Sequence, residues 1–157
     1  MPNLVIPTIV RSLHNIFTSI WIGGMLVTAL SFLPALRKEI SDKKLRNAVI
    51  RRFLVRQSGW VYLGIAVLAV TGALMARFSG KSAGLFSFAS RYSAILAVKH
   101  LLFLAVTVIA VLRSVMLRKP PAVQDKKRMK ISDALLMLNA LLGLAILVLS
   151  SLNAVIP

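Results

Sequence analysis

The stretch SAILAVKHLLFLAVTVIAVLRSVML, residues 93–117, decides the fold of this chain. Only Lys99, His100 and Arg113 interrupt its apolar character with an ionisable group. About 20 apolar residues in a helix cross the hydrocarbon core of a bilayer. Hydrocarbon offers a polar backbone no partner, so a spanning segment of this kind must be helical. The stretch therefore predicts a transmembrane helix.

Three further apolar runs have comparable length, at Ile6–Leu36, Gly59–Ala76 and Ala134–Val155. The chain is 58% hydrophobic and 15% charged, whereas a soluble domain has about 25% charged residues. We therefore predict one all-α domain over residues 1–157, an integral membrane four-helix bundle with short loops. The expected helices cover about residues 6–36, 59–77, 93–117 and 132–155, with an extension of the second back to residue 43 left open.

The net charge of +16 is concentrated in two of the expected connections. Residues 37–57 hold eight Lys or Arg and two acids, and residues 118–131 hold six and one. By the positive-inside rule these connections are cytoplasmic, so both termini face outward in a multi-pass plasma-membrane protein. The same charge predicts contact with anionic lipids of the inner leaflet rather than with nucleic acid.

Several local features carry predictions of their own. Pro34 is expected to bend or end the first helix near its cytoplasmic face. Residues 41–56 have an amphipathic pattern and either lie on the inner leaflet or extend the second helix. We expect Ser132 or Asp133 to cap the fourth helix, and Asp133 to pair with Arg113.

Two more features lie elsewhere in the chain. The outer connection at residues 78–92 mixes Gly and Ser with Leu85 and Phe86, which suits a loop folded back over the membrane or a pocket. In the second helix, Thr71 and Gly72 are expected to serve close helix packing.

The two histidines, His14 and His100, are the strongest functional signal because both lie inside apolar segments. An ionisable residue at membrane depth is costly and usually functional. Each histidine is expected about 10 Å below the outer start of its helix. If the first and third helices face each other, the two imidazoles can serve as axial haem ligands or bind another metal.

Side chains of suitable type surround both histidines. Thr18 and Trp21 share the face of the first helix that carries His14, and Phe103 shares the face that carries His100. Haem propionates need cations near the interface. The candidate cations at the outer end are Arg11, Arg77, Lys81, Arg91 and Lys99.

The acidic residues restrict the chemistry. All four, Glu39, Asp42, Asp125 and Asp133, fall on the predicted cytoplasmic side, and the chain has no cysteine. The outer site therefore lacks a carboxylate base and any thiolate ligand. We assign no catalytic residue, and whether the protein is an enzyme stays open.

The chain resembles the CopD (copper-resistance protein D) membrane domain and the HemJ-type protoporphyrinogen oxidases. The motifs that carry the resemblance are Arg11-Ser-Leu-His14, Trp21-Ile-Gly-Gly24, Leu33-Pro34-Ala-Leu36, Val70-Thr71-Gly72, Val98-Lys99-His100-Leu101 and Leu138-Asn139-Ala-Leu-Leu-Gly143. It implies a four-helix membrane bundle, and for HemJ-type proteins b-type haem with a histidine and a lysine at the positions of His14 and Lys99. The chain departs from that pattern at Ala140, where HemJ-type proteins carry an acid.

The leading hypothesis is a membrane b-type haem protein, ligated by His14 and His100 and acting in electron transfer or a haem-linked redox reaction. The alternatives are copper transport, protoporphyrinogen oxidation, and a cofactor-free accessory subunit of a membrane complex. A redox partner or quinone fits the leading hypothesis. A homo-oligomer or a larger membrane complex stays open.

Overall fold

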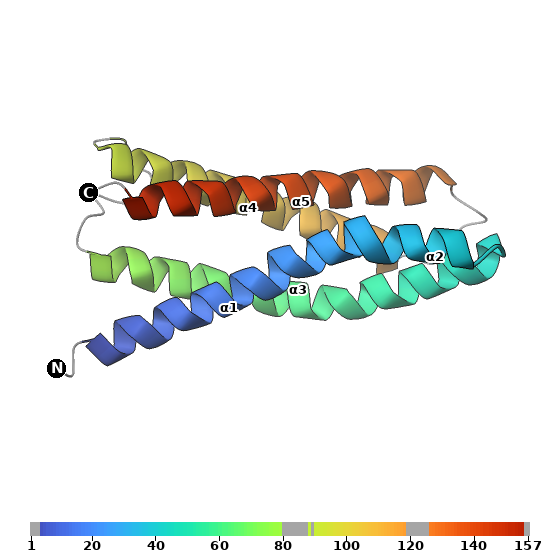
Figure 1. Ribbon diagram of the computed structural model, residues 1–157, viewed down its shortest axis with the longest axis horizontal. Helices are drawn as coiled ribbons and strands as arrows, with labels where there is room; N and C mark the ends of the chain where they lie inside the picture. The colour runs from blue at the N-terminus through green and yellow to red at the C-terminus, as the bar shows by residue number, and fades with distance from the viewer. Residues whose placement is uncertain (1–3, 80–87, 89, 119–125, 156–157) are drawn as a thin grey trace.

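The computed structural model describes residues 4–79, 88, 90–118 and 126–155, and in this part the chain is helical with short connections (Figure 1). Lys81, Leu85 and Phe86 of the outer connection, and Asp125, lie outside the described residues. The elements in chain order are α1 Val5–Val27, the π-helical turn η2 Thr28–Phe32, α2 Leu33–Glu39, α3 Lys43–Ser79, α4 Arg91–Arg118 and α5 Lys126–Val155. The predicted all-α four-helix bundle is confirmed.

The bundle consists of two antiparallel helix pairs (Figure 1). The most extensive packing joins α1 to α3 and α4 to α5, while smaller contacts of α3 with α4 and of α1 with α5 close the ring. α1 and α4 are therefore diagonal partners. The start of α1, the start of α4 and the end of α5 lie at one end of the bundle (Figure 1). His14 and His100 are each nine residues from the start of their helix, so this end is called the histidine end. The opposite end is called the basic end. It contains the end of α2, the first turns of α3, the end of α4 and the start of α5.

The exposed surface of the spans is largely apolar, as suits a lipid-facing surface. On α4 the exposed residues form a continuous row of aliphatic side chains, Val98, Leu101, Leu104, Val108, Leu112 and Val115. Four helices in the described part are long and apolar enough to cross a membrane. We conclude that this is a multi-pass membrane protein.

The first span does not end at Pro34, contrary to one of the two expectations for that residue. α1, η2 and α2 follow one another without a break from Val5 to Glu39. Proline lacks the N–H that would bond to the carbonyl four residues earlier, and its ring clashes with that carbonyl. The wider turn of η2 lies immediately before Pro34 and lets the helix continue.

The two readings of residues 41–56 are also resolved. α3 is a single helix of 37 residues, about 55 Å long, which exceeds the ~30 Å hydrocarbon core. Its first turns therefore extend the second span beyond the hydrocarbon at the basic end. They do not form a separate helix on the membrane surface.

Two expectations for α5 are wrong. The helix begins at Lys126, six residues before Ser132, so neither Ser132 nor Asp133 caps it. Asp133 forms its ion pair with Arg37 of α2 and not with Arg113, although its charge still acts on Arg113. Arg113 donates from Nε to the Ser132 carbonyl and hydroxyl, at 3.1 and 3.2 Å. Both arrangements tie α5 to its neighbours at the basic end.

Arginines satisfy the carbonyls at the last turn of α4. Arg51 of α3 donates to Leu117 O at 2.9 Å and to Arg118 O at 3.3 Å. Arg128 of α5 donates to Met116 O at 2.9 Å. The final carbonyls of a helix lack partners within the helix and carry partial negative charge, which a guanidinium neutralises. The basic end is therefore held together by its own cations.

We expect Arg51→Met to lower the free energy of unfolding by about 1–3 kcal/mol, because it leaves partly buried carbonyls without their donor. Arg52→Met is the matched control, since Arg52 is exposed beside it. Denaturant titration of both variants in one detergent measures the difference. An equal loss in the two variants would contradict the capping role.

A second prediction concerns the contact between α1 and α5. A side chain at Gly143 would meet Ile22 atoms at 3.3 Å and Met25 Cε at 3.5 Å, whereas a side chain at Gly23 would meet nothing within 4 Å. Gly143→Leu should therefore destabilise the bundle by about 1–3 kcal/mol through overpacking. Gly23→Leu should have little effect in the same thermal unfolding assay, and a comparable loss there would refute the packing.

Candidate functional site

His14 is held on α1 by a hydrogen bond to the neighbouring helix α3. Its Nδ1 lies 2.8 Å from Thr71 Oγ1. The Thr71 hydroxyl donates to Val67 O at 2.6 Å. Since its single proton is thereby committed, the hydroxyl accepts from His14 Nδ1–H. The neutral imidazole therefore carries its proton on Nδ1 and a lone pair on Nε2.

Gly72, the residue after Thr71, makes room for the same ring. A Cβ at Gly72 would lie 3.7 Å from His14 Cε1. The sequence assigned Thr71 and Gly72 to close packing, and the structure adds that what packs there is the imidazole. In the sequence, a Thr-Gly pair at membrane depth was the signal that could have indicated a partner for a histidine. Only the packing of α1 against α3 shows that this partner belongs to His14.

His100 on α4 is held in the same tautomer by a different group. Its Nδ1 lies 2.7 Å from the carbonyl of Leu96, one turn earlier in the same helix. A carbonyl only accepts, so Nδ1 donates and Nε2 carries the lone pair. Metal-ligating histidines characteristically donate one ring N–H to a protein group, which fixes the tautomer and the orientation of the ring. Both histidines meet this condition.

A small cavity lies beside His14, in the middle of the bundle. It has a volume of about 50 Å³, and all four long helices contribute to its wall. The lining residues are His14, Thr18, Trp21, Ile22, Leu68, Phe103, Val106, Gly143 and Ile146. Three of the predicted site residues, Thr18, Trp21 and Phe103, are thus brought together with His14. His100 is not part of this wall.

Trp21 and Phe103 meet across the diagonal between α1 and α4. Their ring centroids lie 5.8 Å apart with the rings at 88°, an edge-to-face contact. The buried indole Nε1–H of Trp21 has no acceptor among the described residues. It is a polar donor in an apolar cavity wall, where a bound group can accept its hydrogen bond.

His14 precedes Trp21 by seven residues and His100 precedes Phe103 by three, and these two rings are in contact. Because α1 and α4 run in the same direction, both histidines lie on the same side of that contact, toward the starts of their helices. Their equal depth stays a prediction.

The predicted cations differ in their relation to the site. Lys99 is half-buried on α4, whereas Arg11, Arg77 and Arg91 are exposed at the histidine end. Lys81 lies outside the described residues. None of these cations with a described position lines the cavity.

The chemistry available at the cavity follows from these groups. The described acids, Glu39, Asp42 and Asp133, all lie at the basic end, as the sequence predicts. No group of three or more His, Asp or Glu side chains gathers anywhere in the described part of the chain. The cavity therefore offers an imidazole lone pair and an indole N–H, but no carboxylate base.

Comparison with known proteins adds no relative: no family model, curated protein or solved structure matches the chain. The site is therefore interpreted from its own geometry.

We expect Thr71→Val to release the His14 ring, because valine has the shape of threonine without the hydroxyl acceptor. In protein labelled with ¹⁵N-histidine, the single Nδ1–H form should give way to a mixture of tautomers. Thr71→Ser should retain the wild-type spectrum. Thr107→Val is the matched control on α4, and a change there but not in Thr71→Val would contradict the assignment.

Proposed function

We propose that this protein binds a b-type haem at the histidine end of the bundle and acts in electron transfer or a haem-linked redox reaction. His14 and His100 are its axial ligands, one from each helix pair. With the basic end cytoplasmic, the site lies in the outer half of the plasma membrane.

The observation that supports the proposal best is the shared state of the two imidazoles. Each donates Nδ1–H to a protein acceptor and keeps its lone pair on Nε2, the nitrogen that then ligates a metal. If the histidines served only to join helices, they would not both need a fixed tautomer with the lone pair on Nε2. Two neutral imidazoles and no thiolate are the donor set of a bis-histidine haem.

The two imidazoles are suitable ligands for haem, but the cavity beside His14 is too small to contain one. The cavity of about 50 Å³ is far below the ~300–1,000 Å³ of typical cofactor pockets. Binding of a haem would therefore require the two helix pairs to move apart around the histidines.

The remaining site residues have distinct tasks. Trp21, Phe103 and Thr18 surround the ligand and exclude water from it. Lys99 and the exposed cations Arg11, Arg77 and Arg91 neutralise the carboxylates of the porphyrin. A haem would supply one-electron chemistry, and the chain would fix its ligands and its electrostatic surroundings.

The test is an absorption spectrum of detergent-purified protein, oxidised and reduced. Wild-type protein should show a six-coordinate low-spin haem, and His14→Ala or His100→Ala should each abolish that signature. Thr71→Val keeps the ligand but removes its support, so haem affinity should fall about 10–100-fold. Thr107→Val should bind as wild type.

Protein without haem, or a spectrum unchanged in both histidine variants, would refute the proposal. Copper found in place of porphyrin, with its binding dependent on both histidines, would favour the copper-transport alternative instead.

A second candidate function is protoporphyrinogen oxidation, because the resemblance to HemJ-type proteins places their histidine and lysine at His14 and Lys99, and Lys99 is half-buried on α4. It predicts porphyrinogen turnover that is lost in Lys99→Met, while the haem spectrum remains. Porphyrinogen left unoxidised by wild-type protein that contains haem would exclude this activity and leave electron transfer.

A further inference from the structure

The cations of the basic end fall into two structural classes. One class consists of arginines that bond to the protein itself, namely Arg37, Arg46, Arg51, Arg113, Arg118 and Arg128. The other class is exposed and forms no side-chain hydrogen bond or ion pair with any described residue; its members are Lys38, Lys43, Lys44, Arg52, Arg56, Lys127 and Lys130. The helix packing does not account for this second class.

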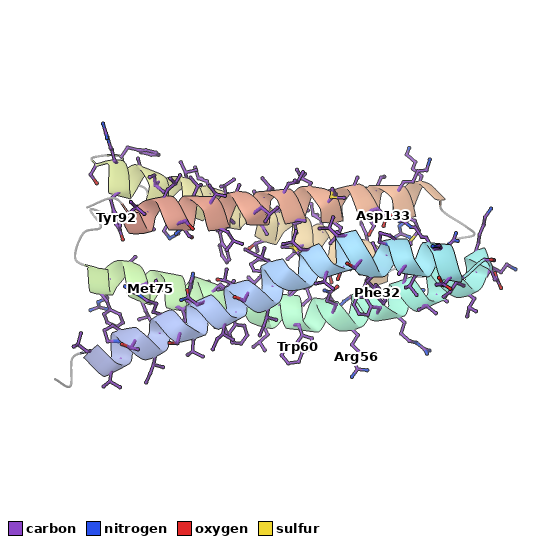
Figure 2. The ribbon with its side chains drawn as sticks, in the orientation of Figure 1. Phe32, Arg56, Trp60, Met75, Tyr92 and Asp133 are labelled. Atoms are coloured by element: carbon purple, nitrogen blue, oxygen red, sulfur yellow. The ribbon has the colours of Figure 1, made fainter. Side chains whose placement is uncertain are left out.

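Two cations of the second class, Arg52 and Arg56, lie one turn apart on α3, and Trp60 follows one turn later. Residues four apart share a face of a helix. Figure 2 shows Arg56 and Trp60 on the same side of α3, pointing away from the other helices. Trp60 is 61% exposed, although burial is available to an indole elsewhere in the bundle, as Trp21 at 6% shows.

The spacing along α3 places this face at the membrane interface. From Trp60 to Arg77 the helix rises about 26 Å, close to the ~30 Å hydrocarbon core. Tryptophan is favoured at the boundary between hydrocarbon and headgroups. Arg56 and Arg52, one and two turns beyond Trp60, then lie at the height of the lipid phosphates. Arg118, whose guanidinium lies 5.6 Å from the Tyr62 ring centroid and donates to Ser58 Oγ, is at the height of Trp60.

We infer that Arg52, Arg56 and Trp60 form a binding site for one anionic phospholipid in the leaflet at the basic end. The two guanidinium groups complement the negative headgroup. Trp60 and Leu63, which is 46% exposed, lie where the glycerol and acyl chains begin. We name a phospholipid as the occupant because the order of the residues along α3 matches the order of its parts. The arginines lie outward, where the headgroup is, and Trp60 and Leu63 lie inward, where the acyl chains are. This inference does not depend on haem binding.

The test uses the fluorescence of Trp60 in reconstituted protein. Vesicles contain mixtures of phosphatidylglycerol and phosphatidylcholine in which one lipid at a time is brominated, because bromine quenches a tryptophan in contact. Brominated phosphatidylglycerol should quench at a several-fold lower mole fraction than brominated phosphatidylcholine. The Trp60→Phe variant gives the Trp21 signal to be subtracted.

The double variant Arg52→Gln/Arg56→Gln should remove this preference, with about five-fold weaker selection for each cation lost. Lys43→Gln/Lys44→Gln loses the same charge farther from the membrane and should keep the preference. Equal losses in the two double variants would show diffuse attraction by net charge and overturn the site. An unchanged preference in Arg52→Gln/Arg56→Gln would overturn it as well.

Discussion

Hydrocarbon provides no hydrogen-bond partner, and this constraint governs the backbone of the bundle. The regular helices satisfy their own backbones, so the exceptions show where side chains must act. At the turn before Pro34, the Gly24 carbonyl accepts from the Thr28 hydroxyl at 2.6 Å and from Gln57 Nε2 at 3.4 Å. At the basic end of α4, Arg51 of α3 and Arg128 of α5 perform the same task for the last carbonyls. At these two places of the described chain, side-chain donors meet carbonyls at an irregular turn or a helix end.

The same constraint prepares the candidate site. An imidazole in this environment must find a partner for its N–H, and His14 finds one whose own proton is already used. The result is a single tautomer with a lone pair beside a small cavity. His100 reaches the same state through its own helix, so its tautomer survives even if the helix pairs move apart. The tautomer of each histidine is thus fixed by its own hydrogen bond, without a ligand that joins the two.

The pairing of the helices places the two histidines in different helix pairs. Packing is most extensive within the α1–α3 and α4–α5 pairs, and His14 belongs to one pair while His100 belongs to the other. Trp21–Phe103 joins the pairs in the middle of the bundle, and Arg37–Asp133 and Arg51–Leu117 join them at the basic end. A ligand held by both histidines would therefore bridge the two pairs.

The sequence by itself determined the four spans, the ends at which charge collects, and the histidines as the residues to examine, because apolar length and intramembrane charge act locally. It placed Thr18, Trp21 and Phe103 near the histidines for the same reason, since helical spacing is a local property. It could not show that α3 is continuous, that Asp133 pairs with Arg37, or that Thr71 supports His14. These facts depend on which helices are neighbours and in what register, and apolar helix faces are too alike to specify that. Only the tertiary structure, which packs α1 against α3 and places α1 diagonal to α4, decided them.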